Sequence, residues 1–221
     1  MSQVLIGLVG YYQFVRGYPI GPELSERLHA HAWPNDVVSF KEMNWGPIAI
    51  VQDFQASDET YERIVLVTAV DRGLKTGTVT CRQWLGGKLD VLSVQDRVFE
   101  AVTGIINVDN LLVIGEHFGI WPKELISVEV QLGDHTFGDL VLSEIETNRA
   151  NGEVNIVGDN PLMPEMEEIV ARIFEATCIA ATQPLDTIPG LQSMNAEQVT
   201  PLTDVCHNQF IEDCKLTSKI N

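Results

Sequence analysis

Several side chains in this sequence could bind a metal ion or transfer a proton, but they form no established catalytic motif. Carboxylates and imidazoles are common ligands of divalent metals and common general acids and bases. No G-x-S-x-G element is present to support a serine nucleophile. The candidates for a metal or catalytic site are Glu42, Asp71, Glu129, Asp134, His135 and the pair Glu116-His117.

Glu129 is the most informative of these candidates because it interrupts an apolar run, Leu125–Val130. A carboxylate costs free energy when it is buried without a partner. Glu129 therefore either takes part in a rebuilt site or lies at a solvated strand end, and the sequence leaves both alternatives open.

Two other patterns carry little chemistry. Cys206, His207 and Cys214 offer only three soft ligands and no C-x-x-C pair, so cysteines without a function are the simpler interpretation. The glycines that follow Val4–Val9 lack the G-x-G-x-x-G spacing, which argues against a dinucleotide site.

The composition narrows the classes of partner. The 221 residues include 14 Lys and Arg against 31 Asp and Glu, for a formal charge of -17. This charge would repel phosphate backbones and anionic lipids, so we expect neither nucleic acid nor a membrane as partner. The first 15 residues carry no formal side-chain charge and lack the basic region of an export signal. Four irregularly spaced cysteines suit a reducing compartment, so the expected location is cytoplasmic.

Hydrophobic periodicity predicts alternating strands and helices. The predicted strands are Val4–Val9, Val37–Phe40, Ile64–Val70 and Leu125–Val130, and the predicted helices are residues 23–32, a helix opening at 45–47, most of 96–118, and a last helix from Pro164 to near Cys178. This alternation indicates an α/β protein with a mostly parallel sheet and helices on both faces.

Two segments depart from the alternation. Gly77–Val91 predicts an antiparallel hairpin at the sheet edge, with Gly86-Gly87 in its turn. Residues 181–205 show little periodicity and contain Pro184, Pro189, Gly190 and Pro201. We therefore predict one α/β domain over residues 1–180 and a C-terminal arm over residues 181–221 that is extended or partly disordered.

The spacing of glycines around the first strand resembles that of the hydrogenase maturation endopeptidases. The matching positions are Gly7, Gly10, Ile20, Gly21 and Pro22, and further likeness lies in Ile64–Gly77, Asn110–Val130 and the last helix. The resemblance covers residues 3 to about 178. It implies a three-layer fold of the phosphorylase/hydrolase-like type.

Members of that family remove a C-terminal extension from a nickel-iron hydrogenase large subunit and recognise nickel in the substrate through three ligands. The resemblance places these ligands at Tyr18, Thr68 and Gly104, or at Gln95 for the third with a gapped alignment. A phenol, a hydroxyl and a glycine are poor ligands for a transition metal. The site is therefore expected to be degenerate, with no metal and no cofactor.

Three hypotheses follow. The first is a noncatalytic protein that binds a hydrogenase-type large subunit, or its C-terminal segment, with Tyr18 and Trp45 as aromatic contacts. The second is an active maturation endopeptidase that uses displaced ligands such as Asp71, Glu129 or His135. The third is a structural subunit whose C-terminal arm wraps a neighbour.

Overall fold

A computed structural model describes residues 3–10, 20–34, 37–102, 107–132, 150–152 and 164–199. The chain divides into two compact units. The first comprises Met1–Asn44, Asp58–Trp84 and Trp121–Ser193, and the second comprises Trp45–Ser57, Leu85–Ile120 and Met194–Asn221.

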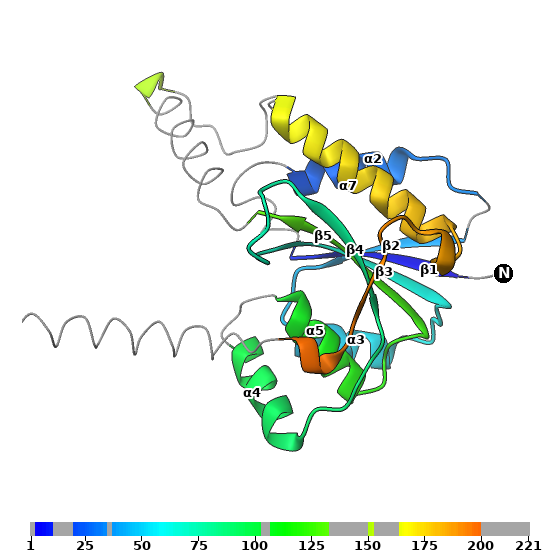
Figure 1. The fold of residues 1–221 in the computed structure, drawn as a ribbon, viewed down its shortest axis with the longest axis vertical. Coiled ribbons are helices and arrows are strands. Elements are labelled where there is room, and N and C mark those ends of the chain that lie inside the picture. Colours follow the sequence, from blue (N-terminus) through cyan, green and yellow to red (C-terminus); the bar gives the residue numbers. More distant parts are fainter. Residues whose placement is uncertain are drawn as a thin grey trace, which may run out of the picture. The chain divides into compact units, whose positions relative to one another are not determined.

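A six-stranded, mostly parallel sheet organises the first unit (Figure 1). Its order is β2-β1-β3-β5-β4-β6, in which β1 pairs in parallel with β2 and β3, β3 pairs in parallel with β5, and β4 pairs antiparallel with β5. The strands are β1 (Val4–Val9), β2 (Val38–Met43), β3 (Arg63–Val70), β4 (Val79–Trp84), β5 (Glu124–Gln131) and β6 (Gln192–Met194). The predicted α/β class with a mostly parallel sheet is confirmed.

The three adjacent parallel strands β1, β3 and β5 are buried along nearly their whole length. Near-continuous apolar sequence is typical of parallel strands whose two faces are both covered. Gly7 lets neighbouring side chains approach β1 closely, because a Cβ at this position would lie 2.7 Å from Met43 Cε.

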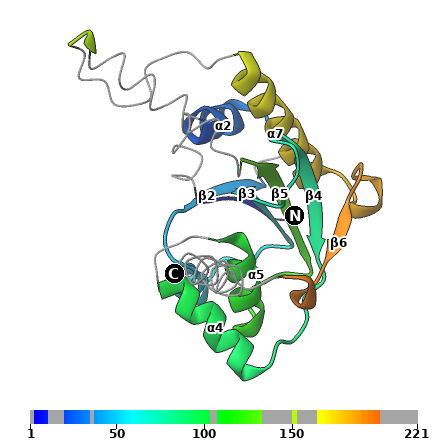
Figure 2. The ribbon, with the colours of Figure 1, turned by 60° about the vertical axis from the view of Figure 1, so that its left-hand side comes forward.

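Two helices of the first unit, α2 (Ile20–Ala30) and α7 (Pro164–Thr182), pack against each other and share a core with the sheet (Figure 2). The helix α7 begins with Pro164 and has Glu165 and Glu167 in its first turn, where negative charge is favourable. Its inner face buries Met166, Ile169, Val170 and Ile173. The predicted start of this helix and its predicted apolar stripe are confirmed.

The described residues of the second unit include three α-helices: α3 (Pro47–Ala56), α4 (Val91–Val102) and α5 (Val108–His117). They pack on one another around Val51, Ala101 and Ile114. The side chain of Asn107 caps α5 by accepting a hydrogen bond from the backbone N–H of Asp109 at 2.9 Å. None of the described helices combines the length and the apolar composition needed to cross a membrane.

The predicted hairpin over Gly77–Val91 is wrong in its second half. β4 is antiparallel, as expected, but its partner is β5, and Val91 opens the helix α4. The missed signal is Asp90, whose Oδ1 accepts hydrogen bonds from the backbone N–H groups of Leu92 at 2.9 Å and Ser93 at 3.1 Å. A carboxylate that satisfies the first N–H groups of a helix fixes its start.

Residues 183–199 fold into short elements where the sequence indicated an extended or partly disordered arm from residue 181. They contain two 3₁₀ turns, Leu185–Thr187 and Ala196–Gln198, with β6 between them. Asn195 and Gln198 form a reciprocal capping box. Short-range capping of this kind leaves almost no periodicity in the sequence. Residues 200–221 of the predicted arm lie outside the described residues.

Candidate functional site

The sheet register brings Thr68 and Glu129 together at the carboxyl ends of two parallel strands. Thr68 on β3 pairs with Glu129 on β5, and Val9 at the end of β1 pairs with Thr68. Directly paired residues point to the same face of a sheet. Both side chains are buried, with exposed fractions of 1% for Thr68 and 0% for Glu129. This pair is the centre of the candidate site.

Glu129 is held by two arginines and a serine. Arg72 donates from Nη2 to Glu129 Oε1 and from Nε to Oε2, each at 3.0 Å. Arg82 Nε lies 3.2 Å from Oε2, and Ser127 Oγ donates to Oε1 at 2.9 Å. A bidentate guanidinium–carboxylate contact with an additional hydroxyl donor compensates for the removal of the carboxylate from water. Glu129 is therefore buried and paired.

The loop that carries Arg72 is fixed by Gln131 at the end of β5. Gln131 Oε1 accepts from the backbone N–H groups of Arg72 at 2.7 Å and Leu74 at 3.3 Å, and Gln131 Nε2 donates to Asp71 Oδ1 at 2.9 Å. Asp71 Oδ1 also accepts from the backbone N–H of Gly73 at 3.1 Å. The carboxylate of Asp71 thus shapes a turn, and the turn positions Arg72.

These contacts limit what the site can do chemically. Both oxygens of Glu129 accept hydrogen bonds from other side chains, and the hydroxyl of Thr68 donates to the carbonyl oxygen of Ala69 at 3.2 Å. Within the described part of the chain, no group of three or more His, Cys, Asp or Glu side chains is placed to hold a metal ion. The described side chains at this edge form a buried charge cluster around Glu129.

Cys81 lies on β4, in register with Val128 of β5, and is 8% exposed. Burial raises the pKa of the Cys81 thiol, and the nearby charge of Glu129 raises it further. Because the thiolate is the reactive form, this cysteine is a poor nucleophile near neutral pH. It contributes to the wall of a cavity of about 370 Å³ that α7 and residues 188–192 also line.

The other predicted site residues are placed as follows. Glu42 is exposed on β2 and accepts a hydrogen bond from Asn44 Nδ2 at 3.3 Å. Trp45 is 62% exposed in the second unit, and the pair Glu116-His117 lies at the end of α5. The structure thus brings Thr68, Asp71 and Glu129 to one edge of the sheet. Outside the described residues lie Tyr18, Gly104, Asp134, His135, Cys206, His207 and Cys214.

Sequence reasoning missed Arg72 and Arg82 as the partners of Glu129. The available signal was indirect: a charged carboxylate that is buried in a strand is commonly paired with a cation, and the chain has 14 Lys and Arg side chains to supply one. Which cation it is depends on the order of the strands, because Arg72 follows β3 and Arg82 belongs to β4.

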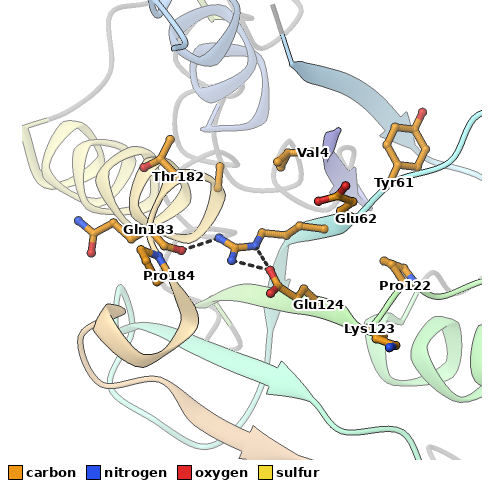
Figure 3. A pocket seen from close by; sticks show the side chains of 11 residues that line it. Val4, Tyr61, Glu62, Pro122, Lys123, Glu124, Thr182, Gln183 and Pro184 are labelled. Carbon is orange, nitrogen blue, oxygen red and sulfur yellow. Dashed lines mark hydrogen bonds and ion pairs between the residues drawn. The ribbon is translucent and has the colours of Figure 1, made fainter. Parts of the chain in front are cut away.

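A second polar cluster lies at the opposite ends of the same strands and lines a cavity of about 650 Å³ (Figure 3). Arg63, the first residue of β3, pairs its Nε with Glu124 Oε2 at 2.7 Å. Its Nη1 donates to the carbonyl oxygens of Ala180 at 2.9 Å and Gln183 at 2.6 Å. Arginine at the carboxyl end of a helix satisfies its last carbonyls. Arg63 therefore joins the end of α7 to the sheet.

The fold and the site together define an α/β protein whose mostly parallel sheet carries a buried charge cluster at its carboxyl edge. No family model and no curated protein matches the chain. Solved structures similar to it are described as endopeptidases or as hydrogenase maturation proteases.

Three of these structures give the extent of the similarity. An endopeptidase from Escherichia coli is 16% identical with a TM-score of 0.46, over 80% of this chain and 91% of that one. The endopeptidase HycI from Escherichia coli is 18% identical with a TM-score of 0.42, over 89% and 99%. The [NiFe] hydrogenase maturation protease HycI from Thermococcus kodakarensis KOD1 is 16% identical with a TM-score of 0.41, over 82% and 94%.

Proposed function

We propose that this chain is a hydrogenase-maturation-protease-like protein that binds a nickel-iron hydrogenase-type large subunit, or its C-terminal segment, and assists its assembly without cutting it. The observation that supports the noncatalytic part of this proposal is the pairing of Glu129 with Arg72, Arg82 and Ser127. The family resemblance of the sequence supports the choice of partner.

The chemistry of the carboxyl edge argues against metal recognition. Transition-metal sites need several nitrogen, sulfur or carboxylate donors with open lone pairs. At this edge the resemblance places Thr68 where the endopeptidases have an aspartate, and its neutral hydroxyl is a weak ligand. Releasing Glu129 to bind a metal would leave two guanidinium groups without their carboxylate, which costs several kcal/mol.

Binding without cleavage requires a contact surface and no nucleophile. Trp45 is 62% exposed, and aromatic side chains are enriched in the anchors of protein interfaces. Trp45 is therefore an aromatic contact expected for a partner's C-terminal segment. The formal charge of -17 disfavours nucleic acid as an alternative partner.

The test is the intact mass of the hydrogenase-type large subunit that copurifies with this chain, compared between cells that contain the gene and cells that lack it. The proposal predicts an unchanged mass and a reduced yield of assembled large subunit without the gene. A large subunit that is shortened only when the gene is intact would contradict the proposal and support the alternative, an active maturation endopeptidase.

A set of variants distinguishes the noncatalytic role from that of an active endopeptidase. If the chain cuts the large subunit with ligands at displaced positions, Asp71→Ala, Glu129→Gln or His135→Ala will leave an unprocessed, longer large subunit. The noncatalytic role predicts the same mass in all three variants, with circular dichroism as the control for folding. Trp45→Ala is expected to reduce copurification of the large subunit and to leave its mass unchanged.

A further inference from the structure

The helix α4 exposes three large apolar side chains and buries two charged ones beside the apolar Val94 and Ala101. Leu92, Phe99 and Val91 are 71%, 70% and 68% exposed, whereas Arg97 and Glu100 are 1% and 2% exposed. A helix on a protein surface normally turns its apolar stripe inward and its charges outward. The outer face of α4 therefore exposes large apolar side chains that surface helices usually bury.

Polar contacts inside the second unit fix this orientation. Arg97 Nη1 donates to Asn110 Oδ1 on α5 at 3.0 Å, and Nη2 donates to the carbonyl oxygen of Val199 at 2.5 Å. Arg97 Nη1 also lies 3.7 Å from Glu100 Oε2. Rotating α4 to bury Leu92 and Phe99 would break these buried contacts. The exposure of the apolar face is thus built into the packing of the unit.

Exposed apolar side chains are concentrated in the same unit. Of the seven large apolar side chains that are exposed among the described residues, only Leu74 belongs to the first unit. The other six are Trp45, Leu85, Val91, Leu92, Phe99 and Phe118. Three of these six, Val91, Leu92 and Phe99, lie on α4, and apolar side chains gathered on one element mark an interaction surface more often than scattered ones do.

The outer face of α4 has a definite pattern. Leu92 and Phe99 are seven positions apart, which places them on one line about 10 Å apart along the helix axis. Asp96 is exposed between them, four residues after Leu92, and Gln95 is its exposed neutral neighbour. The face therefore has two apolar anchors with a negative charge between them.

We propose that the outer face of α4, consisting of Leu92, Gln95, Asp96 and Phe99, binds an amphipathic helix of another protein that carries apolar anchors about two turns apart and a Lys or Arg opposite Asp96. Recognition of this kind rests on anchors at helical spacing, with charge setting the choice of partner. The surface does not depend on the large-subunit partner proposed above.

Charge complementarity selects this occupant over a second copy of the chain. In a twofold-symmetric antiparallel pairing of two α4 helices, Leu92 would face Phe99 of the other copy, and the two Asp96 side chains would meet at the centre. Like charges in direct opposition disfavour that arrangement. A basic residue at the same place makes a favourable contact.

The test uses the full-length chain and a helical probe peptide of leucine and lysine, about 14 residues long, with its leucines on one face. Binding is measured by fluorescence anisotropy. Leu92→Glu is expected to weaken binding at least tenfold, and Leu74→Glu, the same change at an exposed leucine of the first unit, is expected to leave binding unchanged. Asp96→Lys should reverse the charge preference, so that a peptide with glutamate in place of lysine is bound better. Equal binding by wild type, Leu92→Glu and Asp96→Lys would overturn the proposal.

A photo-crosslink identifies the occupant. The chain with Phe99→p-benzoylphenylalanine is irradiated with the probe peptide, and the products are separated by mass. A product with the mass of chain plus peptide supports the proposal. A dimer of the chain would overturn it in favour of a second copy, and an internal crosslink to residues 200–221 would overturn it in favour of the chain's own C-terminal segment.

Discussion

Arg72 and Glu129 form a two-point contact between the loop after β3 and the interior of β5, with both nitrogen–oxygen distances at 3.0 Å. The carboxylate is fully buried, and the side chain of the arginine is 19% exposed. The family resemblance places a degenerate ligand position, Thr68, at the same edge of the sheet. The ion pair at this edge can be tested by its contribution to stability.

Replacing Arg72 with Met should lower the free energy of unfolding by about 3 kcal/mol, because it leaves a buried carboxylate short of a partner. Arg82 and Ser127 remain, which keeps the loss at the lower end of the range for broken buried pairs. Urea unfolding measures the change.

The double variant Arg72→Met, Glu129→Met should lose less stability than Arg72→Met alone, because the fully buried carboxylate is gone and the remaining cation, Arg82, is 21% exposed and can reach water. Arg172→Met, a change at an arginine that is 46% exposed, is the matched control and should stay within about 0.5 kcal/mol of wild type. A double variant that is less stable than the single one would contradict this account of the pair.

Arg63→Met should destabilise the fold by about 2 kcal/mol, because the carbonyl oxygens of Ala180 and Gln183 lose a charged donor at the end of α7. Hydrogen exchange should accelerate in the last turn of α7. Lys123→Met, a neighbouring exposed cation that lines the same cavity, is the control. Comparable losses for both variants would mean that charge near the cavity, and not the helix end, is responsible.

Cys178 should react slowly with iodoacetamide. Burial, together with the charge of Glu175, raises the pKa of the Cys178 thiol from 9.0 to about 11. At pH 8 the thiolate fraction is then about 100-fold lower than for a thiol of pKa 9.0. Mass spectrometry of the peptide containing Cys178, labelled in native buffer and in urea, measures the ratio. Equal rates in the two conditions would contradict the shift.

The same pKa shift gives a stability change of definite sign. As pH rises, the thiol of the unfolded chain ionises first, so the unfolded state is favoured. The contribution of Cys178 to stability is complete below pH 9.0 and is lost as pH rises toward about 11. Cys178→Ser should flatten this part of the stability profile, and a profile identical to that of wild type would count against the assignment.

Gly7→Ala should destabilise the protein by about 1–3 kcal/mol, because the added carbon would lie 2.7 Å from Met43 Cε and 2.9 Å from Met43 Sδ. A double-mutant cycle with Met43→Ala isolates this contact. The losses should be less than additive by about 1 kcal/mol, since shortening Met43 removes the obstruction. Strict additivity would place the cause elsewhere in β1.

Local patterns in the sequence were sufficient for much of the fold. Long apolar runs predicted β1, β3 and β5, and the spacing of apolar residues after Pro164 predicted α7, because periodicity reports directly on backbone state and burial. The predicted start of α4 was wrong because a single side chain, Asp90, gives the signal for it. The hydrogen bonds from backbone N–H groups to Asp90 begin a helix where a hairpin was expected after Gly86-Gly87.

The sequence alone determined the α/β class, the buried strands and the position of Glu129 inside one of them. Only the tertiary structure decided what that carboxylate does: Arg72 is 57 residues away and reaches it because β3 and β5 are neighbours in the sheet. Likewise, a helix as apolar as α4 has two sides that could be buried. The contacts of Arg97 with Asn110 and Val199 turn Leu92 and Phe99 outward. These contacts join separate segments of the chain, so the hydrophobic periodicity of α4 does not reveal them.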